Sequence, residues 1–249
     1  MTASIALSDA DHKGGLRAAG RLSCIIGTLL VALMLHGAWR ALGRRSPWPR
    51  RFLRWVAIIL GADIRVTGTP LRQDAMIAAN HLSWMDILLL AGTSGTRFVA
   101  KAEVAALPLI GWLAGLNRTL FVARGDRLGV GDQVATIRAA LTEGQPLAIF
   151  PEGTTGDDLH LLPFKPALFA ALVPPIPGIR VQPVRIDYGA AAADLTWLGD
   201  DAGDAHARRV LRRPGRFVVT LHYLEPFDPA DFPYRKAIAA EARARIAAS

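Results

Sequence analysis

A histidine and an aspartate lie five positions apart in "AANHLSWMDILLL", residues 78–90, at the edge of a very apolar segment. If His81 and Asp86 shared one continuous helix, five residue steps would set their side chains about 140° apart and about 7.5 Å apart along the axis. That arrangement is too poor for a hydrogen bond. A catalytic pair therefore requires His81 to lie outside the helix, at a junction where a strand turns into a helix and the imidazole can fold back onto Asp86.

Such a pair would support acid–base chemistry at a carbonyl group. A neutral imidazole can take the proton of an attacking hydroxyl, while a carboxylate on its other nitrogen fixes the tautomer and stabilises the imidazolium that forms. The sequence offers no convincing serine nucleophile, because "GTSGT" at 92–96 ends in Thr96 and misses the G-x-S-x-G pattern. It also contains no Walker A loop and no GxGxxG. The attacking hydroxyl can therefore belong to the substrate.

A structural interpretation competes with this one. Ser83 is followed three residues later by Asp86, which is a capping-box pattern that opens a helix. Capping explains Ser83 and Asp86 without chemistry, although it leaves His81 unexplained. Both interpretations stay open at the level of the residues.

Further charged and turn-forming residues follow other predicted strands. Lys101 ends "FVAK", Arg124 ends "TLFVAR", and Glu152, Gly153 and Thr154 follow "AIFP". Ligands of open α/β sheets bind outside the strand ends, so Arg124 could hold a phosphate and Glu152 could bind substrate hydroxyls. Each of these residues could instead be a solvated charge or part of an ordinary turn.

The elements that must position these residues alternate between strands and helices. Short strand-like runs, "IRVTG", "MIAAN", "RFVAK", "TLFVAR", "LAIFPEG" and "VQPVRI", are separated by helical stretches such as "GDQVATIRAALTEGQ". "RFVVTLHYLEP" predicts a late strand and "YRKAIAAEARARIAAS" a final helix, with a surface excursion over residues 187–213. We therefore expect an α/β fold over residues 63–249, a sheet flanked by helices.

The N-terminal quarter predicts membrane association. Residues 1–20 are interpreted as a loose tail, and residues 21–62 as a membrane-associated helical segment. The apolar run from Leu22 to Trp39 approaches the roughly 17–25 residues that cross a bilayer. Arginines and tryptophans follow it, and "RRFLRWVAIILGA" has the pattern of a helix in the interface plane. A true span and an in-plane helical hairpin both remain possible, whereas the arginine cluster directly after the apolar run disfavours a cleaved signal.

Composition narrows the classes of partner. The net charge of +8 favours anionic partners, without choosing among phosphates, nucleic acid and acidic lipid. The single cysteine, Cys24, excludes an intramolecular disulfide framework, and no Cys/His spacing resembles a zinc site. A reducing compartment and the absence of a structural metal are expected.

Four blocks together resemble a known family. "NHLSWMD", which contains the HX4D motif, "FVAR", "FPEGTT" and "VQPVRI" stand in the order and approximate spacing of the motifs of the PlsC-like glycerolipid acyltransferases, over roughly residues 75–186. The resemblance implies that His81 is the general base and that Asp86 orients it. It further implies acceptor-phosphate contacts by Phe121 and Arg124, and glycerol-site roles for Glu152, Gly153 and Thr154. Lys101 and Arg185 match supporting positions. It also implies acyl-CoA or acyl-carrier-protein as the acyl donor, no metal, no further cofactor, and a membrane-bound two-helix N-terminus.

One departure from the family pattern bears on the acceptor. Many phosphatidate-forming members resemble "FPEGTR" at the third motif, whereas this chain has Thr155, followed by "GDDLHLLPFKPALFAA". This version looks more like the lyso-ornithine-lipid branch. The sequence therefore predicts an acyltransferase acting on a lysolipid, with lysophosphatidic acid as the first acceptor, giving phosphatidic acid in phospholipid biosynthesis, and lyso-ornithine lipid as the second.

Two rival functions follow from the same residues. A non-enzymatic membrane adaptor would use the arginine cluster and would have no need of His81, and a lipid hydrolase would put water in place of the lysolipid hydroxyl. For the leading interpretation we expect membrane lipids as partners and no nucleic acid. The expected location is the inner membrane, with the catalytic domain facing the cytoplasm.

Overall fold

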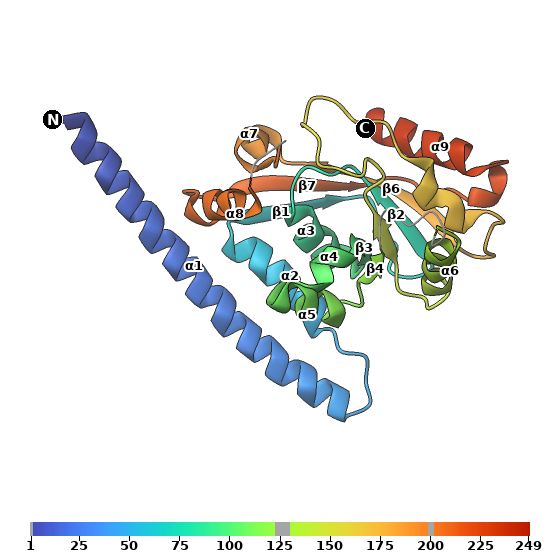
Figure 1. Ribbon diagram of the computed structural model, residues 1–249, viewed down its shortest axis with the longest axis horizontal. Helices are drawn as coiled ribbons and strands as arrows, with labels where there is room; N and C mark the ends of the chain where they lie inside the picture. The colour runs from blue at the N-terminus through green and yellow to red at the C-terminus, as the bar shows by residue number, and fades with distance from the viewer. Residues whose placement is uncertain (1, 123–129, 199–201) are drawn as a thin grey trace.

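A seven-stranded mixed sheet forms the centre of the computed structural model (Figure 1). The structure describes residues 2–122, 130–198 and 202–249, with the side chains of residues 2–11, 101 and 130 left out. The strand order is β1-β7-β6-β2-β5-β3-β4. All neighbouring strands run parallel except β6 and β7, which are antiparallel. The strands are β1 (Ala62–Thr67), β2 (Ala75–Ala79), β3 (Arg97–Lys101), β4 (Leu120–Val122), β5 (Leu147–Ile149), β6 (Arg180–Asp187) and β7 (Phe217–Tyr223).

Helices cover both faces of the sheet, which confirms the predicted α/β class. On one face, α2 (Trp48–Ile59) and α3 (Met85–Ser94) pack against side chains such as Ile77 and Ile186. On the other, α6 (Val130–Leu141), η2 (Pro166–Leu172) and α9 (Arg235–Ala247) pack against side chains such as Met76 and Val181. Every residue of β2 is buried because both faces are covered. The carboxyl end of this central strand leads directly into the "NHLSWMD" segment.

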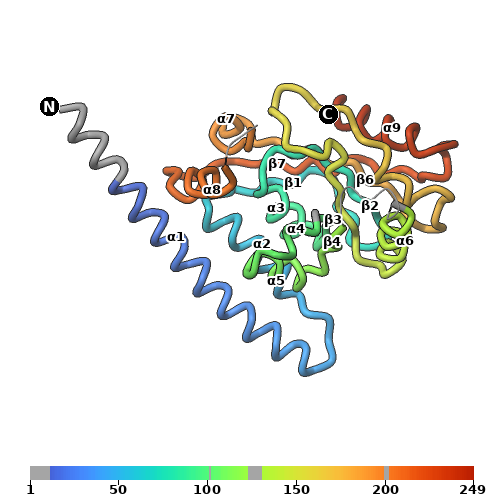
Figure 2. The backbone as a smooth tube through the Cα atoms, viewed as in Figure 1, coloured from blue at the N-terminus to red at the C-terminus, as the bar shows by residue number. Residues whose placement is uncertain are grey.

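The N-terminal segment forms a helical hairpin of α1 (Thr2–Ala41) and α2 (Figures 1 and 2). Residues from His12 to Ala41 are long and apolar enough to cross a membrane, and few of them are buried. Ile25 and Leu29 nevertheless pack against the core of the domain. The structure thus provides a candidate helix for membrane association.

Residues 1–20 differ from the expected loose tail, because α1 begins at Thr2. Arg21 donates from Nη1 to the carbonyl oxygens of Val210, Leu211 and Arg213, at distances of 3.0, 3.1 and 3.0 Å. These carbonyls lie at the end of α8 (Gly203–Arg212), where a helix leaves its last acceptors unpaired and favours a cation. Extending an existing helix is also easier than starting one, so the apolar segment can propagate helix toward the N-terminus.

The region from 187 to 213 also differs from the expected surface excursion. It contains η3 (Gly189–Ala191), α7 (Ala192–Leu195) and α8, and the side chains of Leu195, His206 and Val210 are fully buried. Because this region is rich in alanine, aspartate and arginine, its few core-facing apolar residues gave no recognisable periodicity in the sequence. The remaining elements, α4 (Ala102–Ala105), α5 (Pro108–Leu116) and η4 (Pro229–Asp231), lie in connections between strands or before α9.

Candidate active site

Asn80 directly follows the central strand β2, where the chain turns out of the sheet. Its side-chain Nδ2 donates to the carbonyl of Ile186 at 3.0 Å, and its Oδ1 accepts from the amide of Ile186 at 2.7 Å. The side chain thereby continues the pairing of β2 with β6 after the backbone of β2 has left the sheet. The following residues form the turn between β2 and α3 that a contact between His81 and Asp86 requires.

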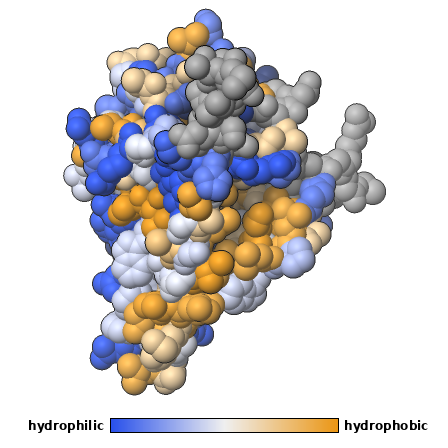
Figure 3. Space-filling view, turned by 90° about the vertical axis from the view of Figure 1, so that its left-hand side faces the viewer, coloured by the Kyte–Doolittle hydropathy of each residue, from blue (hydrophilic) through white to orange (hydrophobic). Residues whose placement is uncertain are grey.

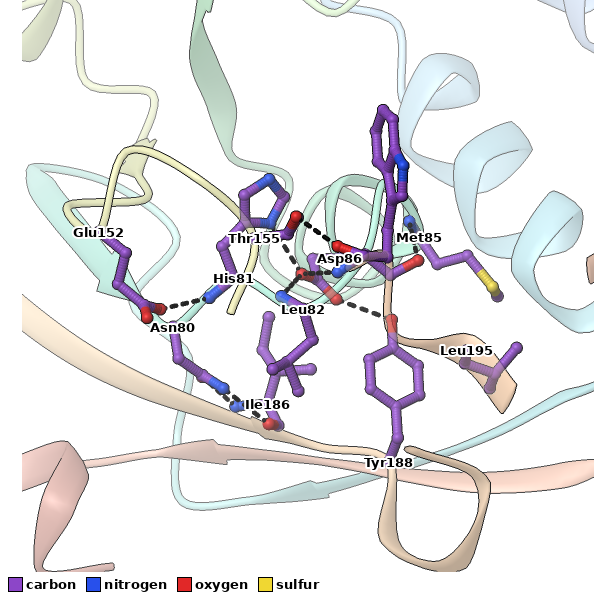
Figure 4. A network of polar contacts seen from close by, with 12 residues as sticks. Asn80, His81, Leu82, Met85, Asp86, Glu152, Thr155, Ile186, Tyr188 and Leu195 are labelled. Carbon is purple, nitrogen blue, oxygen red and sulfur yellow. Dashed lines mark hydrogen bonds and ion pairs between the residues drawn. The ribbon is translucent and has the colours of Figure 1, made fainter. Parts of the chain in front are cut away.

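His81 and Asp86 form the predicted pair. The imidazole Nδ1 lies 2.9 Å from Oδ2 of Asp86, and Asp86 is fully buried (Figure 4). Because a carboxylate accepts hydrogen bonds, Nδ1 carries the proton and Nε2 remains available as an acceptor. The imidazole ring stacks on Phe150, with ring centroids 3.9 Å apart, which limits its rotation.

Asp86 performs both of the roles that the sequence left open. Its Oδ2 also accepts from the backbone amides of Leu82 and Ser83, at 2.7 and 2.9 Å, which is the carboxylate half of the predicted capping box. The N-cap residue of α3 itself is Trp84, which makes no side-chain cap bond. Capping and pairing with His81 are therefore not alternatives. The same oxygen fixes the turn and orients the imidazole.

Tyr188 supplies a fourth hydrogen bond to the Asp86 carboxylate, and sequence reasoning missed it. The phenol donates to Oδ1 of Asp86 at 2.7 Å from a fully buried position (Figure 4). Burial, and then the neighbouring carboxylate, raise the pKa of Tyr188 well above its ordinary value, so the phenol stays protonated and donating. Tyr188 directly follows β6, which runs parallel to β2, so both strands end at the same edge.

Glu152 holds the backbone around His81. Its Oε1 accepts from the amide of His81 at 2.8 Å, and its Oε2 accepts from the amide of Leu162 at 3.0 Å. The amide of Gly156 in turn donates to the carbonyl of His81 at 2.8 Å. Burial raises the pKa of Glu152, against the effect of the two amides, which lower it. The structure thus gives Glu152 a positioning role, and contact with substrate hydroxyls stays a prediction.

The loop after Glu152 is fastened to the region between β6 and α8. The hydroxyl of Thr155, which stands where many relatives have arginine, donates to the carbonyl of Trp197. The amide of Trp197 donates to the carbonyl of Leu82 at 2.8 Å. Trp84, inside the "NHLSWMD" segment, donates from Nε1 to Nδ1 of the buried His206 at 2.9 Å. Residues about 70 to 120 positions away in the sequence therefore support the turn that carries His81, and no short sequence pattern indicated them.

Three other predicted site residues, Gly153, Thr154 and Arg185, differ in their surroundings. Gly153 adopts a positive φ of 76° in the loop after β5, where a side chain would crowd Lys165. Thr154 is exposed beside it. Arg185 lines a cavity of about 340 Å³ together with Glu152, and donates to the carbonyl of Ser249.

The structure places only one of the three remaining predicted contacts. Phe121 lies on β4, the edge strand, which β5 and β3 separate from β2. Lys101 ends β3, but its side chain lies outside the described part, and Arg124 lies wholly outside it. Their roles toward an acceptor stay predictions. Among the described residues, no group of three or more His, Cys, Asp or Glu side chains could hold a metal ion.

A family model described as Acyltransferase matches residues 63–187. The chain is 34% identical to the lyso-ornithine lipid O-acyltransferase of Rhodobacter capsulatus, over 95% of this chain and 92% of that protein. The chain belongs to the acyltransferase family. The chain is therefore an enzyme that transfers acyl groups, and a non-enzymatic adaptor was the wrong alternative. The catalytic roles of His81 and Asp86 stay a prediction.

Other relatives are named for two different acceptors. The lyso-ornithine lipid O-acyltransferase of Pseudomonas aeruginosa is 37% identical over 83% of each chain. The 1-acyl-sn-glycerol-3-phosphate acyltransferase of Neisseria meningitidis is 30% identical over 53% of this chain and 51% of that protein. The fold resembles that of the 1-acyl-sn-glycerophosphate acyltransferase PlsC from Thermotoga maritima. The TM-score is 0.65, at 21% identity over 93% of this chain and 95% of that one.

Proposed function

We propose that this enzyme transfers a fatty acyl group from a thioester donor to the free hydroxyl of a lyso-ornithine lipid. The observation that carries the reaction type is the His81–Asp86 pair, with Nδ1 bound to a buried carboxylate and Nε2 left as an acceptor. Acyl-CoA or acyl-carrier-protein is the proposed donor, because both present the acyl group as a thioester.

The proposed mechanism needs no enzyme nucleophile. Nε2 of His81 takes the proton of the acceptor hydroxyl as its oxygen attacks the thioester carbonyl carbon. The Asp86 carboxylate stabilises the imidazolium that forms. When the tetrahedral intermediate collapses, the carbon–sulfur bond breaks and the imidazolium proton passes to the departing sulfur. The products are an ester and a free thiol, and His81 returns to its neutral form.

Two observations favour lyso-ornithine lipid over lysophosphatidic acid, and so reverse the order that the sequence suggested. In sequence, the relatives named for lyso-ornithine lipid match 95% and 83% of the chain, whereas the relative named for 1-acyl-sn-glycerol-3-phosphate matches 53% of it. In addition, Asp157 and Asp158 line the cavity beside Glu152. Arg185 and Arg243 also line this cavity, so its three carboxylates leave it less attractive to a phosphate than a purely cationic cavity would be.

An acceptor panel tests the proposal. Purified protein in detergent, supplied with radiolabelled acyl-CoA, should acylate lyso-ornithine lipid faster than lysophosphatidic acid, and His81→Ala should remove both activities. Faster acylation of lysophosphatidic acid would reverse the order of acceptors while leaving the chemistry at His81 intact. Release of free fatty acid without a lysolipid product would instead support the hydrolase alternative.

We further propose that the enzyme lies at the inner membrane with its catalytic domain facing the cytoplasm. The arginines between Arg40 and Arg54 support this orientation through the positive-inside tendency. Thioester donors are also made in the cytoplasm. A reporter fused after Ser249 that was accessible only from outside this membrane would contradict the orientation.

A further inference from the structure

Helix α5 presents an apolar face to the surface of the molecule. The stretch "AALPLIGWLAGLN", residues 105–117, contains no charged residue. Within it, Leu109, Ile110 and Trp112 are 58, 55 and 47% exposed, and Leu107 just before the helix is 48% exposed. A helix that faces water normally carries polar side chains on its outer side. The outer side of α5 has none.

The contact between α5 and α4 determines which side of α5 faces the protein, and it leaves Leu109, Ile110 and Trp112 on the outer side. Gly111 is the buried residue of the helix, and a Cβ atom at this position would lie 2.4 Å from the carbonyl oxygen of Ala105. The absence of a side chain lets α5 lie directly against α4. A rotation that buried Ile110 or Trp112 instead would lose this close approach, so their exposure is a consequence of the fold.

The position of α5 links the N-terminal hairpin with the catalytic edge of the sheet. Leu113 and Leu116 share a small cavity with Leu33 of α1 and Trp48 of α2. At its other end, α5 connects through α4 to the carboxyl end of β3. This edge is also where β2 delivers His81, because β2, β5 and β3 run parallel.

The helical hairpin also exposes large apolar side chains. Leu30 and Met34 of α1 are 63 and 70% exposed, and Trp55 and Ile58 of α2 are 36 and 40% exposed. Figure 3, which views the molecule from the side of α1, shows apolar side chains gathered over the lower and central part of this face. Exposed apolar surface of this extent marks a binding surface for a membrane or another protein.

We propose that α5 is a second membrane contact, whose outer face inserts into the boundary between lipid headgroups and acyl chains. α5 packs beside α1, a helix apolar enough to enter a bilayer, around the cavity that Leu113 and Leu116 share with Leu33, so one membrane surface can contact both helices. An indole such as that of Trp112 is also suited to the headgroup layer. Docking through α5 holds the catalytic edge against the bilayer, where a lysolipid can reach His81 without leaving the membrane.

Spin labelling in vesicles separates this contact from anchoring by α1. The full chain with Cys24→Ser carries a nitroxide at Ile110→Cys or, as a control, at Tyr234→Cys, which is 56% exposed beside α9. In vesicles of phosphatidylethanolamine and phosphatidylglycerol, the label at 110 should collide with oxygen and be shielded from a water-soluble nickel chelate. The label at 234 should show the reverse.

Two outcomes of this measurement would overturn the proposal. Free access of the nickel chelate to the label at 110 would place α5 in water. Shielding from both oxygen and nickel, with spin–spin broadening between labelled chains, would assign the surface to a second copy of the protein instead of lipid.

A charged variant provides a functional readout. Ile110→Glu should lower kcat/KM about tenfold or more for an acceptor presented in vesicles, since the burial of one side chain of this size corresponds to at least that factor. With a short-chain acceptor dissolved as monomers, the variant should match the wild-type enzyme, which shows that it folds. Tyr234→Glu should be unchanged in both assays. Equal losses of Ile110→Glu in both assays, or none in either, would contradict the membrane contact.

Discussion

Removal of the Tyr188 hydroxyl tests how much the hydrogen bond from Tyr188 to the Asp86 carboxylate contributes to catalysis. In Tyr188→Phe, the Asp86 carboxylate would lose the donor at 2.7 Å on Oδ1 and keep its three donors on Oδ2. A hydrogen bond to a charged group contributes about 1.5–3 kcal/mol. For a protein of this size, such a loss should lower Tm by about 3–12 °C.

The catalytic effect follows from the same free energy. If all of it were lost from the transition state, kcat would fall about 13- to 160-fold, since 1.36 kcal/mol corresponds to tenfold. Because the donors on Oδ2 still hold the carboxylate, we expect the lower end, about tenfold, with KM unchanged. Steady-state kinetics with saturating donor, together with thermal unfolding in the same detergent, would measure both effects.

Tyr223→Phe is the matched control. Tyr223 is also buried, and its hydroxyl bonds a neutral partner, Thr93, at 2.6 Å in the last turn of α3. Its removal should cost about 0.5–1.5 kcal/mol of stability and leave kcat unchanged. If Tyr188→Phe lowered Tm but kept the wild-type kcat, Tyr188 would only hold the fold together and the argument for its role in catalysis would be refuted.

Three further perturbations test other parts of the structure. His81→Ala should lower acyl transfer about 10²–10⁴-fold while far-UV circular dichroism stays unchanged, because it removes a positioned general base; near-wild-type turnover would contradict the mechanism. Burial raises the pKa of Glu152 above its ordinary 4.5. Between pH 4.5 and the raised pKa, the folded protein therefore binds more protons than the unfolded protein does. Stability should therefore fall as pH rises through this window, and Glu152→Gln should remove that slope in thermal unfolding; an unchanged slope would assign it to another group. Arg21→Ala should speed hydrogen exchange at the end of α8, whereas the exposed Arg40→Ala should leave it unchanged.

Local patterns in the sequence determined most of the secondary structure. The strands from β1 to β7 and the helices α6 and α9 were predicted because periodicity and turn residues depend only on neighbours along the chain. The spacing of His81 and Asp86 showed that a contact between them would require a strand–turn–helix junction, and that junction is observed. Local patterns misjudged residues 1–20 and 187–213, where contacts between α1 and α8 and a few buried side chains in polar surroundings decide the structure.

The support of the catalytic pair was decided only by tertiary structure. Tyr188 and Asp86 are 102 positions apart, and Glu152 and His81 are 71 apart. Their contacts depend on β2, β5 and β6 lying side by side and ending at one edge, and many strand orders are compatible with the same sequence of strands. The exposed face of α5 has the same origin, since "LPLIGWLAGL" is apolar on every side and its pattern cannot say which side the fold will cover. The residues that could perform the chemistry thus lie in short motifs that can be recognised in the sequence. The hydrogen-bond donors and acceptors that hold these residues in place come from strands that are distant in the chain and become neighbours only when the sheet forms.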